Sequence, residues 1–315
     1  LKQFLEEKID DQELVRFYMM MNKERTKRME LVKGGTFTLG AKVGEFEKQD
    51  KVKVNASPPV EVYVSSFYID KYEVPYAELS NVFGWAYQHN LVKVKDGWIW
   101  NTEGKPKKLV LLRGKSGTLN ESLMGFADGD FFLQAEDEEI KHPQTHPAAE
   151  ITWYGALAFA NYASDIAGLE RCTDFETWTC DIDKNGYRLP TEAEWEKACK
   201  GGRDRQRFYW GNKLRPRMAN YRHSGDPFEG CDPGTTPIGY YDGDQIPRGP
   251  DMANPYGLYD MIGNVHEWCL DYWNPFWYRH VKPGTRNPRG PSKPPGDAEY
   301  RVYRGLSNVT EADDF

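Results

Sequence analysis

Two carboxylates and a glycine lie close together in the segment NPYGLYDMIGNVHEW (254–268). Asp260 and Glu267 supply carboxylate oxygens, and a turn at Gly263 frees backbone carbonyl groups to point inward. Calcium takes about six to eight hard oxygen ligands of both kinds, at about 2.3–2.6 Å. The segment therefore predicts a calcium site. The alternative is a tight turn in which both carboxylates only accept backbone hydrogen bonds.

The cysteines give a weaker indication. Cys172 and Cys180 flank a short polar segment, RCTDFETWTC, whose length suits a small loop closed by a disulfide. The other three cysteines, Cys199, Cys231 and Cys269, have no evident pairing. A disulfide would favour an oxidising compartment, so we expect a periplasmic, secreted or surface-attached protein whose signal segment has been removed. A cytoplasmic location is the alternative.

The histidines do not indicate a transition-metal site. His142 and His146 flank a loop that contains proline, whereas His residues at this spacing ligate a metal well mainly on a helix. A catalytic Cys–His pair stays open, because such residues meet in space rather than in sequence.

Composition excludes several classes of protein. The 315 residues carry a net charge of −7 with scattered Lys and Arg, so no basic face indicates nucleic-acid binding. No apolar run approaches the about 20 residues that span a bilayer. The 10 Trp, 19 Tyr and 15 Phe, together with 29 Gly and 20 Pro, favour a loop-rich fold anchored by aromatic side chains.

The elements that position these residues follow from periodicity. We expect an amphipathic helix or linker in 1–28 and a domain over 29–315. The domain should begin with a strand–turn pattern in 29–40, whose turn is at Gly34 and Gly35, followed by a strand or hairpin in 60–74 and a helix over 75–90. An insertion of hairpins and loops is expected over about 91–145. Further helices are expected at 152–168, capped by Thr152, and at 191–200, ending at Gly201 and Gly202; about 70 irregular residues follow. This order indicates an α+β fold.

The 191–200 helix has a capping box formed by Thr191 and Glu194. Nearby, Arg188, Glu192, Glu194 and Trp195 could contact a substrate. We favour a structural role for them, as a buried ion pair beside a capped helix.

Several segments together resemble the formylglycine-generating (sulfatase-modifying factor) family, in that family's order. They are MELVKGGTFTLG (29–40), SFYIDKYEVPYAEL (66–79), HPAAEITWYGALAFANY (146–162), NGYRLPTEAEWEKACKGG (185–202), GTTPIGYY (234–241), NPYGLYDMIGNVHEW and RVYRG (301–305). The resemblance implies an irregular, loop-rich variant of the C-type-lectin fold. His266 stands where an aromatic residue is common in the family, so we expect its ring to stack in the core.

The resemblance also implies two structural calcium sites. Carried over residue by residue, the ligands of the first are the side chains of Asp260 and Glu267 and the carbonyl groups of Gly263 and Val265. The ligands of the second map to a separate loop: Asn220, Tyr221, Asp226 and Phe228.

Family enzymes oxidise a peptide cysteine to formylglycine with copper held by two cysteines that follow an Arg-Gly-Gly-Ser segment. Here that segment reads RVYRGLSNVTEADDF, with Leu306 in place of the second glycine and no cysteine after Cys269. The C-terminal part of the family domain is therefore expected to be missing, and copper is expected only if such a part carries cysteines. No catalytic residue is carried over.

We therefore expect a calcium-stabilised, non-catalytic module that binds a protein, peptide or glycan. The alternative is a formylglycine-generating oxidase seen without its cysteine-bearing segment. The aromatic stretch DYWNPFWYRH (271–280) is the candidate contact surface, with Trp273, Trp277 and Tyr278 as contact residues. Aromatic packing beneath the calcium loop is the competing interpretation of this stretch.

Overall fold

The computed structural model describes most of the chain. The described residues are 28–41, 58–114, 122–135, 140–204, 206–231, 234–296 and 299–311. The helix expected within residues 1–28 lies outside this range except for Arg28, and it stays a prediction.

The described residues form a few helices and short antiparallel sheets, which confirms the α+β class. The helices are α3 (Tyr76–Gln88), α4 (Trp153–Ile166) and α5 (Glu192–Lys200), with 3-10 turns η3 (Pro143–Thr145) and η4 (Trp277–Arg279). The strands are β1 (Met29–Val32), β2 (Gly35–Leu39), β3 (Val60–Val64), β4 (Phe67–Asp70), β5 (Val92–Lys95), β6 (Trp98–Asn101), β7 (Lys108–Leu111), β8 (Met124–Ala127), β9 (Asp130–Leu133), β10 (Thr173–Asp174), β11 (Thr179–Cys180), β12 (Glu267–Tyr272) and β13 (Arg301–Arg304). In the parts of the chain that are described, no helix is long and apolar enough to cross a membrane.

The first four strands form one bent ribbon rather than two hairpins. β1 pairs with β4 and β2 pairs with β3, all antiparallel, so the predicted turn at the two glycines bends the ribbon without reversing the chain. At the bend, the Gly34 N–H donates to Ser66 Oγ over 2.8 Å. A Cβ on Gly34 would lie 2.8 Å from the Ser66 nitrogen, so the close crossing requires glycine.

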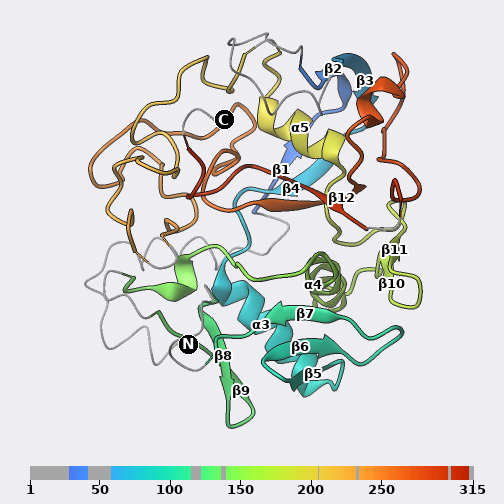
Figure 1. The fold of residues 1–315 in the computed structure, drawn as a ribbon, viewed down its shortest axis with the longest axis vertical. Helices are drawn as coiled ribbons and strands as arrows, with labels where there is room; N and C mark the ends of the chain where they lie inside the picture. The colour runs from blue at the N-terminus through green and yellow to red at the C-terminus, as the bar shows by residue number, and fades with distance from the viewer. Residues whose placement is uncertain are drawn as a thin grey trace.

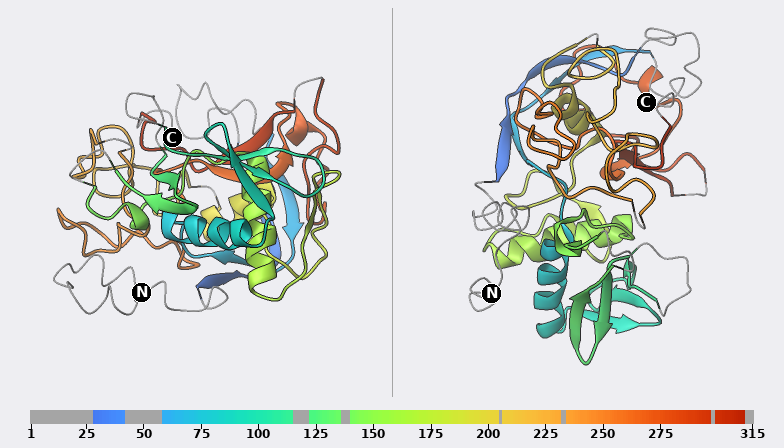
Figure 2. Two further views of the ribbon diagram at one scale, coloured as in Figure 1. Left: turned by 90° about the horizontal axis from the view of Figure 1, so that it is seen from below. Right: turned by 90° about the vertical axis from the view of Figure 1, so that its left-hand side faces the viewer.

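The largest core lies between α3, α4 and the sheets of the predicted insertion. Tyr76 and Phe83 of α3 and Leu157 and Tyr162 of α4 are fully buried in it. β5, β6 and β7 form one small sheet beside this core, and β8 with β9 forms a second. Figure 1 shows these elements in the lower half of the molecule, and the right-hand view of Figure 2 shows the same division. The hairpins predicted for residues 91–145 are thus confirmed, and they lie against the two helices.

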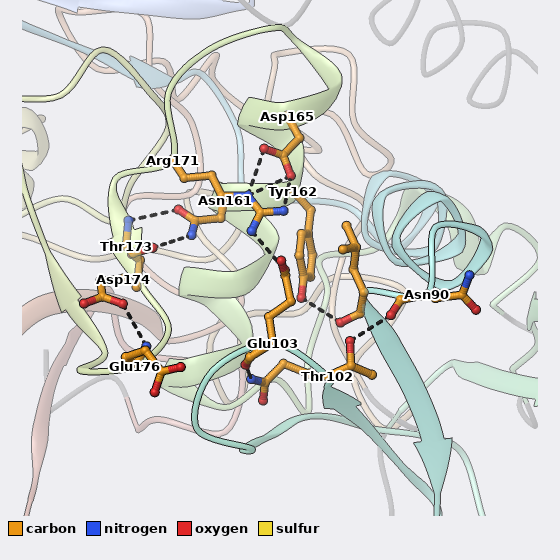
Figure 3. A network of polar contacts seen from close by, with 12 residues as sticks. Asn90, Thr102, Glu103, Asn161, Tyr162, Asp165, Arg171, Thr173, Asp174 and Glu176 are labelled. Atoms are coloured by element: carbon orange, nitrogen blue, oxygen red, sulfur yellow. Dashed lines mark hydrogen bonds and ion pairs between the residues drawn. The ribbon is translucent and has the colours of Figure 1, made fainter.

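A polar network ties the insertion to α4 (Figure 3). The Arg171 guanidinium lies 2.6 Å from an Asp165 oxygen near the end of α4 and 2.9 Å from Glu103, which follows β6. Next to it, the Asn161 amide donates to the Thr173 carbonyl and accepts from the Thr173 N–H. These contacts join the segment after β6 to α4 and to the chain that follows α4, and the position of the insertion on α4 is therefore fixed by charge as well as by packing.

Both predicted helix caps are confirmed. The Thr152 hydroxyl accepts from the Gly155 N–H at the start of α4. Thr191 and Glu194 form the expected capping box at the start of α5. Arg188 donates to both Glu194 oxygens, at 2.8 and 2.9 Å, which confirms the structural interpretation of this pair. α5 ends at Gly201, whose left-handed backbone (φ 60°) suits glycine.

Residues 201–266 form the irregular region that the sequence predicts, drawn in yellow to orange in Figure 1. Side-chain amides order this region in place of sheet ladders, and Asn264 is the main example. Its backbone N–H donates to the Asn220 carbonyl, and its carbonyl accepts from the Asn308 N–H. Its side chain donates to Glu73 over 2.7 Å and accepts from the Thr236 N–H over 3.0 Å. One residue therefore links four distant segments.

Candidate functional site

A third carboxyl group, that of Glu73, lies near the two carboxyl groups of the first predicted calcium site. Burial raises the pKa of Asp260 and of Glu267 to about 7. Burial and the neighbouring Asp260 and Glu267 carboxylates raise the pKa of Glu73 well above its usual value. Among the described residues, none of the ion pairs involves any of these three groups. The cluster is therefore buried negative charge that lacks a paired cation, which is an unfavourable arrangement unless an ion or protons balance it.

Hydrogen bonds position these carboxylates only in part. Asp260 accepts from the Gly239 N–H over 2.5 Å, and Glu267 accepts from the Trp195 indole over 3.1 Å. Glu73 accepts from Asn264 and from the Val265 N–H. The predicted alternative, bonding to backbone donors alone, thus describes part of the geometry but leaves the charge uncompensated.

Two further observations favour an ion at this place. The Thr236 hydroxyl, bonded through its backbone to Asn264, is buried without a hydrogen-bond partner among the described residues. Gly305 has a positive φ of 93°, and a Cβ added there would lie 3.4 Å from the Val265 carbonyl oxygen and 3.6 Å from a Glu267 oxygen. The missing side chain thus leaves space between two predicted ligand oxygens. The donor set is entirely oxygen and negatively charged, so the residues fit calcium.

Side chains alone would not suffice for such a site. Within the described parts of the chain, no group of three or more His, Cys, Asp or Glu side chains is close enough to hold a metal ion. An ion there would therefore depend on backbone carbonyls as well as on Asp260 and Glu267, as the Gly263 and Val265 predictions require.

The residues of the second predicted site are brought together, but their polar groups already have protein partners. The Asn220 amide donates to the Gly234 carbonyl, and Gly234 lies beside the Phe228 carbonyl. One Asp226 oxygen accepts from the Phe228 N–H, and the other accepts from the Ser224 and Tyr241 hydroxyls. The Tyr221 carbonyl accepts from the Ser224 N–H. This geometry describes a tight turn as well as it describes an ion site, and calcium there stays a prediction.

The cysteines are free thiols, so the structure does not contain the predicted Cys172–Cys180 disulfide. Cys180 lies opposite Thr173 in the β10–β11 pair, one position away from Cys172. The Cys172 thiol is directed to the Lys184 carbonyl, 3.8 Å away. The predicted oxidising compartment loses this support and stays a prediction.

The predicted contact surface over residues 271–280 is partly exposed, but Asp271 and Tyr278 within it are buried. Tyr278 is only 4% exposed, and its hydroxyl donates to Glu192 over 3.0 Å. Trp277 is half-buried against the core of β2 and β3. Tyr278 is therefore not available to a partner, and of the three predicted contact residues only Trp273, 37% exposed, is an exposed one. The expectation for His266 is also wrong in part, because His266 is exposed, although its ring lies 4.6 Å from that of Tyr303.

A cavity of about 690 Å³ opens between the insertion, the start of α4 and the β12–β13 pair. Six aromatic side chains line it: Trp98, Trp153, Tyr154, Trp268, Tyr300 and Tyr303. They come from segments up to about 200 residues apart, so their grouping was missed from the sequence. The one available signal was the aromatic character of the segments WIW (98–100) and RVY (301–303).

Charged side chains surround the aromatic rings of this cavity, and most of the cations already lie on ring faces. Lys107 Nζ lies 4.2 Å from the centre of the Tyr154 ring, and Lys108 Nζ lies 4.8 Å from that of Trp98. The Arg301 guanidinium lies between the rings of Trp153 and Tyr272, at 3.6 and 3.4 Å. Glu150 and Glu299 complete the lining, so the charges nearly balance.

Comparison with known proteins gives a consistent result. The family model described as "Sulfatase-modifying factor enzyme 1-like domain" matches residues 17–314. The chain is 30% identical over 285 residues to the formylglycine-generating enzyme of Thermomonospora curvata, covering 85% of this chain and 79% of that protein. It is 28% identical over 294 residues to the mouse formylglycine-generating enzyme, covering 89% of this chain and 66% of that protein. It is also 28% identical over 283 residues to the serine/threonine-protein kinase pkn1 of Chlamydia caviae, covering 88% of this chain but only 32% of the kinase.

Two solved structures share the fold. Treponema denticola variable protein 1 superposes with a TM-score of 0.51 at 23% identity, covering 90% of this chain and 85% of that one. The crystal structure of CarF gives a TM-score of 0.51 at 22% identity, covering 90% and 87%. At these identities the likeness concerns the fold alone.

Proposed function

Because the chain belongs to the sulfatase-modifying factor (formylglycine-generating enzyme) family, we propose that it is a calcium-stabilised member that binds a protein, peptide or glycan rather than oxidising one. The proposal includes a periplasmic or surface location, where calcium modules with dissociation constants of about 10⁻⁴–10⁻³ M operate.

The observation that carries the proposal is the aromatic cavity. Its volume of about 690 Å³ falls within the range typical of ligand sites, about 300–1,000 Å³. Tyr300 and Tyr303 are 65% and 55% exposed at its rim, and aromatic rings in such positions dominate binding energies. They are grouped with four other rings around one cavity, and such a grouping, unlike a single exposed ring, marks a candidate ligand site.

Calcium would support this function from a distance. Asp260 and Glu267, with the carbonyls of Gly263 and Val265, would hold the ion, and its charge would balance the buried carboxylates. Glu267 begins β12, which carries Trp268 into the cavity. Glu267 therefore connects the predicted calcium site to β12, the strand whose Trp268 lines the cavity.

The thiols of the chain do not fit copper. Cu(I) requires thiolates within common reach, and burial raises the pKa of Cys180 to about 11 and that of Cys199 to about 12. The Cys172 thiol is directed to the Lys184 carbonyl, and the Cys199 thiol is directed to the Met261 carbonyl. These thiols therefore do not provide a copper site for the oxidation.

A formylglycine-generating oxidase is the second candidate, favoured by 30% identity to the Thermomonospora enzyme over most of the chain. In that case the copper ligands would have to be cysteines other than the five of this sequence.

Two measurements separate these functions. The purified protein is incubated with Cu(I), air, dithiothreitol as the two-electron reductant and a cysteine-containing peptide, and mass spectrometry follows conversion of the peptide thiol to the aldehyde with release of sulfide. In parallel, the protein is applied to arrays of immobilised peptides and glycans, with Tyr303→Ala as the cavity variant and Tyr68→Ala as the control. Tyr68 is 62% exposed on β4, which does not line the cavity.

The binding function predicts no aldehyde beyond the copper-only control, together with array signals that Tyr303→Ala loses and Tyr68→Ala keeps. Catalytic turnover of the peptide would overturn it in favour of the oxidase. Array signals that survive Tyr303→Ala would place binding elsewhere on the molecule.

A further inference from the structure

We propose that the aromatic cavity takes an uncharged saccharide; this inference rests on the proposed binding function and narrows its ligand class. The argument concerns three properties of the lining: which ring faces are occupied, which indole donors are used, and how the charges balance.

The occupied ring faces argue against a cationic ligand. Aromatic faces attract cations, but here Lys107, Lys108 and Arg301 already cover the rings of Tyr154, Trp98 and Trp153. A cationic ligand would have to displace these three side chains from the rings. An anionic ligand is also disfavoured, because Glu150 and Glu299 lie in the same lining as the cations.

The indole donors argue against a proline-rich peptide. Such peptides dock in aromatic grooves and depend on donors for their backbone carbonyls. In this cavity the Trp153 indole donates to the Cys269 carbonyl over 2.9 Å, and the Trp268 indole donates to the Ile151 carbonyl over 3.0 Å. These two donors are therefore used within the protein, and what their rings offer is apolar surface.

An uncharged sugar matches what is left. A pyranose ring has a face of C–H groups that stacks on an aromatic ring, and an edge of hydroxyl groups that both donate and accept hydrogen bonds. Trp268 and Tyr303 meet edge-to-face, with ring centres 6.0 Å apart, so they present two surfaces at an angle. Glu150, Glu299 and Lys107 at the rim supply acceptors and donors for hydroxyl groups without a strong net charge.

The lining also explains why the cavity keeps its shape. The Tyr154 hydroxyl donates to Glu299 over 3.2 Å, which joins α4 to the segment before β13. The Thr152 hydroxyl lies 2.7 Å from the Lys108 carbonyl, which joins the start of α4 to β7. Rings held in place before binding lose little conformational entropy, and affinity benefits accordingly.

The test uses the full chain and defined probes. Isothermal titration calorimetry is run with cellohexaose, maltohexaose, xylohexaose, mannohexaose and chitohexaose. The cationic counterpart of the last, the fully deacetylated glucosamine hexamer, and a decaproline peptide serve as comparison ligands. The variants are Tyr303→Ala, Tyr303→Phe and Tyr300→Ala, with Tyr68→Ala as the exposed control, and circular dichroism checks that each is folded.

We expect saturable binding of at least one uncharged hexasaccharide, about tenfold weaker in Tyr303→Ala and unchanged in Tyr303→Phe and Tyr68→Ala. The deacetylated hexamer and decaproline should bind more weakly. The inference is overturned if no uncharged sugar binds, if Tyr303→Ala binds as the wild type does, or if decaproline is preferred. Peptide signals on the arrays would then still support the binding function, whereas silence in both experiments would remove both.

Discussion

His146 should make the protein sensitive to mild acid. Its side chain is 1% exposed, its Nδ1 lies 2.9 Å from the Thr235 hydroxyl, and its ring meets Phe228 edge-on. Burial lowers the pKa of His146 from 6.5 to about 3, and the neighbouring His142 acts in the same direction. The imidazole is therefore neutral in the folded protein at pH values at which it is protonated in the unfolded chain.

The sign and the magnitude follow from this difference. Between pH 6.5 and 3 the unfolded state binds more protons than the folded state, so stability is lost as the pH falls through this range. At pH 5.0 the unfolded-state pKa lies about 1.5 units above the solution pH. At about 1.36 kcal/mol for each unit, His146 alone should cost about 2 kcal/mol relative to pH 7.5.

The assay is urea unfolding of the wild type and His146→Gln at pH 7.5, 6.5, 5.5 and 5.0. The variant loses the packing of the ring, so its stability should be lower throughout, but its free energy of unfolding should fall by about 2 kcal/mol less between pH 7.5 and 5.0. His280→Gln, at an exposed position, serves as the control and should follow the wild type. Parallel pH profiles for wild type and His146→Gln would refute the reasoning.

Three other changes test the remaining structure. Calcium at about 100 times its dissociation constant should raise the free energy of unfolding of the EDTA-treated wild type by about 2.7 kcal/mol, and that of Asp260→Asn much less. Equal responses of the two proteins in thermal melts, or no response in either, would rule out the predicted calcium site. Gly263→Ala should lower the free energy of unfolding by about 1–3 kcal/mol more than Gly284→Ala does. Both glycines have a positive φ, but only at Gly263 would an added Cβ meet backbone, 2.2 Å from the Asn220 carbonyl oxygen. Equal losses of stability in urea titrations would contradict this. Tyr278→Phe removes the hydroxyl that donates to Glu192 and should lower the free energy of unfolding by about 1–3 kcal/mol. Trp273→Ala, at an exposed position, should change it by about 0.5 kcal/mol or less. The reverse order of the two effects would revive the predicted contact role of Tyr278.

Local chemistry was sufficient to predict the helices. Thr152 and Thr191 cap their helices through hydroxyl groups a few residues from the N–H groups they bind, so the signal is contained in a short stretch of sequence. The same holds for the Arg188–Glu194 pair and for the left-handed glycine that ends α5.

Pairings between distant residues were not predictable in this way. β1 pairs with β4 because the ribbon bends at Gly34, yet a strand–turn pattern describes a bend and a reversal equally well. The contribution of Glu73 to the carboxylate cluster has no local signal either, because its partner Asn264 lies 191 residues away. The Cys172–Cys180 disulfide was predicted from spacing alone, whereas the hairpin pairs Cys180 with Thr173 and the Cys172 thiol is directed to the Lys184 carbonyl.

The bonds of Asn264 also bear on how the protein folds. The contact with Glu73 closes a stretch of 191 residues, and the contact with Asn308 brings in a strand-flanking segment from the far side of β13. Loop closure over such distances is slow and is compensated only when the amide contacts form. We therefore expect the described parts of residues 201–266, whose contacts reach elements from earlier and later sequence, to be among the last parts of the chain to become protected from hydrogen exchange during refolding.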